Sequence, residues 1–274
     1  MRSARQRRIE TEEAVREWAE SLALSRSADT LRAYRGALDL FLVSPAKKLR
    51  AYERGDIVRW LDSLVSPATC HVYYHGVHSF FVFCTERGYI KQDPSAGIRL
   101  PNVPARMVRA LKPDELSRLV YAAACRSQAR AWAILLLYYS GCRLREATAL
   151  RWEDVEEDHQ LRIRHGKGDK ERVVPIGPGL RATLEGLRSC SKDGRIVACQ
   201  PRTLRQWVHD AGADADLAYV HPHTLRATCA TTMLRRGAVP DVVQNFLGHS
   251  KLETTLRHYH AWSEGDKEEA AALL

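Results

Sequence analysis

Apolar residues recur at helical spacing along the first ninety residues of the chain. Over residues 11–23 they follow the i, i+3, i+4 pattern of a helix with one buried face. A second helix is expected to be capped by Asp29, and two more are expected over residues 56–64 and 67–87. Four short helices without a clear strand predict a small helical bundle.

Proline and arginine interrupt this pattern between Asp93 and Arg109. The helix-breaking residues are Pro94, Gly97, Pro101 and Pro104. Because proline and the residue before it resist the helical conformation, the stretch predicts an extended segment. Its arginines fit either a solvated tether or a segment lying along a phosphate backbone, and the sequence leaves both open.

The pattern after residue 110 predicts helices and one small sheet. Helices are expected near residues 114–125, 128–140, 143–151, 178–189, 201–211, 223–236, 240–247 and 251–260. Apolar and polar residues alternate between Leu161 and Ile176 on both sides of the segment Gly166-Lys-Gly-Asp169, which predicts strand, turn and strand. Residues 265–274 form a short amphipathic tail.

These elements predict a mainly α protein with a small β-sheet, in the α+β class. The 274 residues suffice for two domains at roughly 100–200 residues each. We expect a helical domain over residues 1–98, a basic linker over 99–109 and a mixed domain over 110–274.

The charge of the chain points to a polyanionic partner. Lys and Arg number 42 against 33 Asp and Glu, a net charge of +9, and nucleic acid fits this excess better than an anionic membrane does. Arginine supplies most of the excess and can fork a phosphate bidentately. No apolar run approaches the roughly 18 residues that span a bilayer, and no apolar signal core follows the basic N-terminus. We expect a cytoplasmic protein that associates with nucleic acid and has no membrane partner.

Cysteine and histidine patterns argue against metal chemistry. The seven cysteines are odd in number and scattered, without a C-x-x-C motif, which disfavours a disulfide framework or a zinc finger. His221 with His223, and His258 with His260, lack the i, i+4 helical pairing and nearby acidic or thiolate ligands of a catalytic zinc site. No metal and no cofactor are expected.

Two candidate phosphate ligands lie in the middle of the chain. In Ser140-Gly-Cys-Arg-Leu-Arg-Glu146, the glycine should end an apolar helix, so that Arg143 falls at the start of the next. Glu146, three residues on, could orient it, although the two also fit a surface ion pair. Lys167 lies at the hairpin tip between glycines that permit close approach to a ligand, yet many turn lysines are merely solvated.

Further candidates follow near the C-terminus. His223 and Arg226 share a face at the start of a helix, and His249 follows a helix that Gly248 should end. Tyr259 near the end of the next helix adds a hydroxyl nucleophile. Taken singly, these residues equally fit helix caps, a surface arginine and a core or interface tyrosine.

In this order, the motifs resemble those of the tyrosine recombinase, or phage integrase, family over nearly the whole chain. The matching segments are Ser140-Gly-Cys-Arg-Leu-Arg-Glu146, Gly166-Lys-Gly-Asp-Lys-Glu-Arg-Val-Val-Pro175, His223-Thr-Leu-Arg226, Leu247-Gly-His-Ser250, and Thr254-Thr followed by Tyr259. The resemblance implies a catalytic cluster of Arg143, Lys167, His223, Arg226 and His249, with Tyr259 as nucleophile. Tyr259 is the tenth residue after His249. Many phage-type members of the family share this spacing, whereas the commonest members have the tyrosine at the ninth position. No other tyrosine follows His249.

The resemblance also implies the architecture and the reaction. A core-DNA-binding domain and a catalytic domain would close on duplex DNA as a C-shaped clamp, in a simple Xer-like or phage-type member without an extra arm-site domain. DNA would be cut and rejoined through a 3′-phosphotyrosyl intermediate without ATP or metal, by four protomers on two sites. An accessory or directionality protein is compatible with this scheme, and the tail could pack on its own domain or on a neighbouring protomer. The alternatives are a type IB topoisomerase-like relaxing enzyme and a non-catalytic DNA-binding protein.

Overall fold

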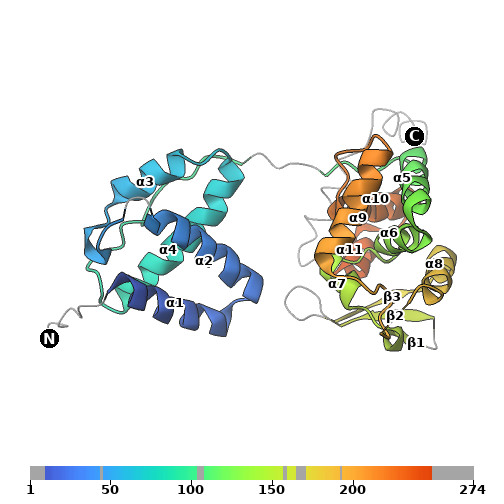
Figure 1. The fold of residues 1–274 in the computed structure, drawn as a ribbon, viewed down its shortest axis with the longest axis horizontal. Helices are drawn as coiled ribbons and strands as arrows, with labels where there is room; N and C mark the ends of the chain where they lie inside the picture. The colour runs from blue at the N-terminus through green and yellow to red at the C-terminus, as the bar shows by residue number, and fades with distance from the viewer. Residues whose placement is uncertain are drawn as a thin grey trace. The chain divides into compact units, whose positions relative to one another are not determined.

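The computed structural model describes residues 10–43, 46–103, 108–156, 159–164, 171–191 and 193–248. The chain divides into two compact units, Met1–Ala105 and Arg106–Leu274 (Figure 1). The predicted hairpin tip, the helix expected near 251–260 and the tail over 265–274 lie outside the described residues.

The first unit is a helical bundle, as the periodicity predicts. Its elements are α1 (Thr11–Ser25), α2 (Ala28–Val43), the short 3₁₀ helix η1 (Leu49–Ala51), α3 (Arg54–Asp62) and α4 (Pro67–Glu86). The long α4 packs against the other three α-helices. Its Phe80 and Phe81 are fully buried and meet the rings of Trp18 and Phe41 edge to face. Aromatic packing therefore joins α1, α2 and α4 in one core.

The cap of α2 differs from the prediction. Ser27, which precedes the helix, accepts a hydrogen bond on Oγ from the Thr30 N–H at 3.3 Å. Asp29 lies within the first turn and accepts from Arg32 at 2.8 Å. The assignment of Asp29 as the capping residue is wrong because Ser27, a residue type equally suited to capping, stands at the helix boundary.

The first part of the proline-rich segment is bound to the helical unit. Ser95 is fully buried, and its Oγ lies 2.7 Å from Nδ1 of His78, while its carbonyl accepts from the Tyr74 hydroxyl at 3.0 Å. Farther along, Nε2 of His71 lies 2.8 Å from the carbonyl oxygen of Pro101. Residues 98–103 have no regular secondary structure, as the prolines predict, but α4 holds them rather than leaving them wholly solvated.

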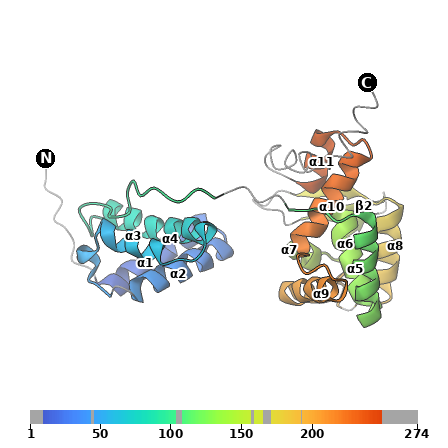
Figure 2. The same cartoon turned by 90° about the horizontal axis from the view of Figure 1, so that it is seen from above.

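The second unit is a cluster of helices around α6. Its helices are α5 (Pro113–Arg126), α6 (Gln128–Ser140), α7 (Leu144–Ala149), the 3₁₀ helix η2 (Trp152–Asp154), α8 (Pro178–Arg188), α9 (Pro201–Asp214), α10 (Pro222–Arg235) and α11 (Pro240–Leu247). Helix α6 contacts α5, α7, α8, α9 and α10. Such a surrounded helix must be apolar on most of its circumference, as Ile134, Leu136 and Leu137 show by their complete burial. Figure 2 shows α9 and α11 at opposite ends of this unit.

A small antiparallel sheet covers one end of the second unit. Strands β1 (Val155–Glu156), β2 (Gln160–Ile163) and β3 (Arg172–Pro175) follow one another in that order. Leu161 pairs with Val174, and both are buried. The predicted hairpin is thus confirmed in its two strands. The short β1 was not predicted because two residues carry no alternation that sequence reasoning could use.

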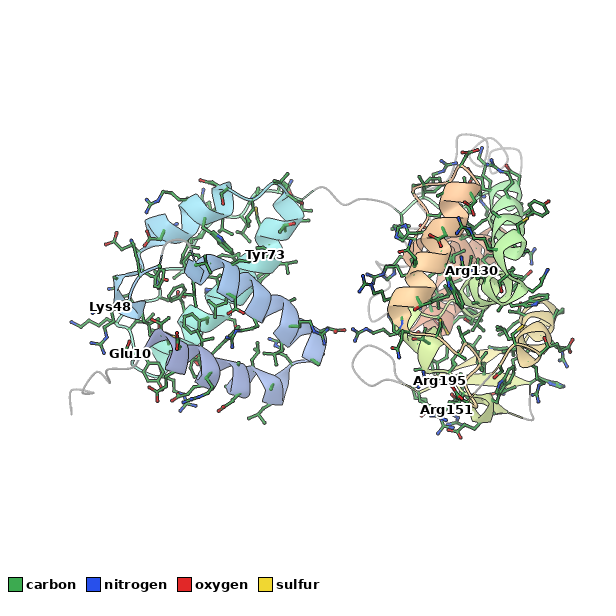
Figure 3. All side chains as sticks on the ribbon, in the orientation of Figure 1. Glu10, Lys48, Tyr73, Arg130, Arg151 and Arg195 are labelled. Carbon is green, nitrogen blue, oxygen red and sulfur yellow. The ribbon has the colours of Figure 1, made fainter. Side chains whose placement is uncertain are left out.

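Helix α7 is shorter than the predicted helix over 143–151. It ends at Ala149 because the chain turns to extended geometry at Leu150, where the N–H still bonds to the Glu146 carbonyl. Arg151 then forms an isolated antiparallel bridge with Arg195, and Figure 3 shows the two side by side near the sheet. Among the described residues, no helix combines the length and the apolar character that crossing a bilayer demands.

Candidate active site

The turn between α6 and α7 presents Arg143. Gly141 has a φ of 58° and ends α6 in the left-handed conformation, which glycine adopts without a side-chain clash. Arg143 is the residue that precedes α7, as predicted. Its backbone N–H donates to Glu146 Oε2 at 2.9 Å, and its guanidinium donates to Glu146 Oε1 at 2.7 Å. One carboxylate therefore caps the helix and orients the arginine.

Glu146 is a buried counter-charge rather than half of a surface pair. Only 3% of the residue is exposed, and its Oε2 also accepts from the Arg172 guanidinium at 2.7 Å. Burial alone would raise the pKa of Glu146, but the hydrogen bonds and charges of Arg172 and Arg143 outweigh it and hold that pKa below its ordinary value. Glu146 is therefore ionised at neutral pH.

Arg226 joins the ends of two helices. It lies in the first turns of α10, which begins at Pro222, and is 6% exposed. Its guanidinium donates to the carbonyl of Gly141 at the end of α6 and, at 2.6 Å, to the carbonyl of Leu247 at the end of α11. Burial, with the nearby charges of Arg143 and Arg172, lowers the pKa of Arg226 to about 10, so it remains protonated at neutral pH.

The end of α11 is bonded by three arginines from three different elements. Successive carbonyl oxygens accept as follows: Phe246 from Arg172 Nε at 3.1 Å, Leu247 from an Arg226 terminal nitrogen at 2.6 Å, and Gly248 from an Arg143 terminal nitrogen at 3.1 Å. These are carbonyls that a helix end leaves without an intrahelical partner, and its dipole favours cations there. We call Arg143, Arg172, Arg226 and Glu146 the arginine cluster. The cluster contains three guanidinium groups and one carboxylate, which bonds to Arg143 and Arg172, so it holds an excess of two positive charges.

His223 lies beside this cluster at the start of α10, in contact with solvent on one side and partly covered on the other. Partial burial lowers its pKa, and so do the neighbouring His221, Arg226, Arg143 and Arg205. The ring is therefore predominantly neutral at pH 7 and can accept a proton. Together with Arg143 and Arg226, it forms the described part of the predicted catalytic set.

The thiols near the cluster are poor alternative nucleophiles. All seven cysteines are free, and Cys142 and Cys229 are buried next to the arginines. Burial raises the pKa of Cys142 to about 11 and that of Cys229 to about 12, which keeps both protonated. Within the described residues, no group of three or more His, Cys, Asp or Glu side chains is arranged to hold a metal ion.

Three predicted site residues, Lys167, His249 and Tyr259, lie outside the described residues. In sequence, the nearest described residues are Arg164 and Glu171 on the two sides of the hairpin tip, and Gly248 just before His249. Gly248 ends α11 with a φ of 66°. The cluster thus holds the carbonyl of the residue immediately before His249.

Sequence reasoning missed the role of Arg172. The residue stood within a matching motif but was not singled out, because an arginine beginning a strand is usually solvated. Its side chain is only 8% exposed, and it pairs with Glu146, whose side chain is 2% exposed. The sequence offered no clear signal for this pair, because both residues stand among other charged residues and lie 26 positions apart, so that only the fold reveals their pairing.

Comparison with known proteins identifies the family of the chain. The Phage integrase family profile matches residues 109–265. A tyrosine recombinase of Thermosipho africanus is 32% identical over 252 residues, covering 85% of this chain and 89% of its own. The fold is similar to that of a chain in the solved structure of a lambda integrase (75–356) dimer bound to a COC′ core site, with a TM-score of 0.80, 17% identity, and coverage of 91% of this chain and 95% of the other. A lambda integrase tetramer bound to a Holliday junction has a TM-score of 0.77, 18% identity, and coverage of 89% and 78%. The chain belongs to the phage integrase family of tyrosine recombinases.

Proposed function

We propose that the protein is a site-specific DNA recombinase that cuts and rejoins DNA through a covalent tyrosine intermediate. The observation that carries the proposal is the arginine cluster, which brings Arg143, from the turn before α7, together with Arg226 of α10 and holds an excess of two positive charges. A scissile phosphodiester is an anion whose charge grows on the non-bridging oxygens during displacement. Preorganised guanidinium donors stabilise that growing charge, and losing one such donor typically costs on the order of 10²–10³ in rate.

The proposed first step is an in-line displacement at phosphorus. The phenolic oxygen of Tyr259 forms a bond to phosphorus, and the bond from phosphorus to the 5′-oxygen breaks. The products are a 3′-phosphotyrosyl enzyme and a free 5′-hydroxyl. His223 accepts the phenol proton, a role that its lowered pKa and exposed position support. Lys167 donates a proton to the leaving oxygen, and His249 donates a hydrogen bond to the phosphate.

The second step reverses the first on a new partner strand. The 5′-hydroxyl of that strand attacks the phosphotyrosyl bond, and Tyr259 leaves with its proton restored. Because the covalent bond conserves the phosphodiester energy, neither ATP nor a metal ion is required. The type IB topoisomerase alternative uses the same bond chemistry but would relax DNA without pairing two sites; membership of the recombinase family disfavours it.

We propose that both units contact DNA and that the protein acts as a tetramer during recombination. The solved lambda integrase assemblies on a core site and on a Holliday junction support both proposals through the shared fold. The helical unit would act as the core-binding domain and the second unit as the catalytic domain, joined through the basic segment over 99–109. An accessory or directionality protein is compatible with this assembly.

The test is covalent capture on DNA. Wild-type protein is incubated with nicked duplexes that carry a randomised central window, and DNA that remains bound to protein in SDS is recovered and sequenced. We expect a defined set of cleavable sites from wild type and none from Tyr259→Phe. A phenylalanine variant that still forms adducts would refute the assigned nucleophile. Adducts that show no sequence preference and no need for a second site would favour the topoisomerase alternative.

A further inference from the structure

Arg172 has no assigned role in strand cleavage, yet it connects the parts of the proposed active site. Arg172 is the first residue of β3, the second strand of the hairpin whose tip carries Lys167. Its Nε donates to the Phe246 carbonyl at 3.1 Å, and one terminal nitrogen donates to Glu146 Oε2 at 2.7 Å. A buried side chain with two internal partners is suited to holding structure in place rather than to contacting DNA.

The aliphatic part of Arg172 also supports the chain at Gly248. A Cβ atom added to Gly248 would lie 3.0 Å from Arg172 Cδ and 3.4 Å from a terminal nitrogen of its guanidinium. The glycine backbone therefore lies directly against the arginine stem. Since Gly248 precedes His249, this contact and the bond to Phe246 hold the point from which the nucleophile-bearing segment leaves α11.

The Arg172 guanidinium also affects the position of Arg143, because both arginines bond to Glu146. The same carboxylate oxygen that accepts from Arg172 accepts from the Arg143 backbone N–H, and its twin accepts from the Arg143 side chain. A planar guanidinium bonds two partners at a fixed angle, whereas an ammonium acts as a point charge. Arg172 therefore fixes Glu146 relative to the end of α11 in a way that lysine could not reproduce.

We propose that Arg172 is a positioning residue for strand cleavage: it locks Glu146, the end of α11 and the base of the Lys167 hairpin together, and so aligns the phosphate-binding arginines with the segment that carries Tyr259. This inference rests on the proposed function. A displacement reaction needs its reacting groups aligned, and a misplacement of about 1 Å can cost on the order of 10²-fold in rate.

The test compares Arg172→Gln and Arg172→Lys with wild type on a duplex recovered by covalent capture. Arg126→Gln is the matched control, because Arg126 joins α5 to Asp214 of α9 by a two-pronged ion pair away from the cluster. Single-turnover adduct formation gives a rate constant at saturating DNA, an amplitude that reports the active fraction, and a half-saturating DNA concentration.

For Arg172→Gln we expect the rate constant to fall on the order of 10²-fold with the amplitude preserved. The half-saturating DNA concentration should change by less than about threefold, since the phosphate-binding arginines remain. Arg172→Lys should lie between this variant and wild type, and Arg126→Gln should match wild type.

Two results would overturn the inference. One is a rate constant for Arg172→Gln within about threefold of wild type at saturating DNA. The other is a loss confined to the amplitude in both Arg172 variants, which would mean that the residue only keeps the unit folded. If wild type itself forms no adduct on any captured duplex, the proposed function fails first and the inference falls with it.

Discussion

Replacing Glu146 with glutamine tests whether the single carboxylate of the arginine cluster stabilises the second unit. The substitution preserves shape and one acceptor oxygen but removes the charge that serves Arg143 and Arg172. Breaking a buried ion pair by removing one partner typically costs about 3–5 kcal/mol. Glutamine retains part of the hydrogen bonding, so we expect a loss of about 3 kcal/mol in the second unit.

Hydrogen exchange measured by mass spectrometry can locate that loss. With about 1.4 kcal/mol per factor of ten, amides of α7 and α11 that exchange through opening of this unit should exchange on the order of 10²-fold faster in Glu146→Gln. Helices α2 and α4 of the first unit provide the internal reference and should be unchanged. Unaltered exchange in α11, or an equal acceleration in both units, would refute the assignment of Glu146 as the anchor of the cluster.

The pH dependence of the same difference gives a sign that can be checked. The pKa of Glu146 is held below its ordinary value of 4.5, so its charge stabilises the folded state fully above the unfolded pKa. That contribution is lost as pH falls through the lower folded pKa. The stability gap between wild type and Glu146→Gln should therefore be constant near neutrality and shrink in acid below pH 4.5. A gap that widened on acidification would contradict the ionic account.

Three further predictions address the turn, the base and the DNA. Gly141→Ala should destabilise the second unit by about 2–5 kcal/mol in thermal denaturation, because the added methyl group meets Leu247 at a position of positive φ. Gly88 also has a positive φ but has open space around it. Gly88→Ala should therefore show only the backbone cost of about 1–2 kcal/mol. Equal losses would remove the packing argument. The adduct-forming rate should rise with pH through a midpoint below 6.5 in wild type, and His223→Gln should abolish that step; its persistence would assign the base elsewhere. DNA affinity measured against salt should follow a log–log slope of about −0.9 per neutralised phosphate, and a flat dependence would exclude phosphate-dominated binding.

Local sequence signals predicted the elements that depend on local physics. Periodic apolar residues gave the helices of both units, and Gly141 and Gly248 marked helix ends that do adopt positive φ. Alternation gave β2 and β3. The register of the motifs also placed Arg143 at the start of α7, where its capping bond to Glu146 needs only a spacing of three residues.

The contacts that assemble the cluster were beyond sequence reasoning because they join distant elements. Arg172 and Glu146 are 26 residues apart, and Arg143 and Gly248 are 105 apart. No periodicity encodes such pairs, and whether an arginine is buried depends on which helix ends surround it. The interpretation of Arg143 and Glu146 as a possible surface pair had the right partners but missed the burial of Glu146 for this reason.

The most direct test of the central claim is to identify the atoms joined in the covalent adduct. Wild-type protein is trapped on a captured nicked duplex, digested with protease and nuclease, and analysed by tandem mass spectrometry. The account predicts a nucleotide attached through its 3′-phosphate to Tyr259. A nucleotide attached to any other residue, or through a 5′-phosphate, would contradict it.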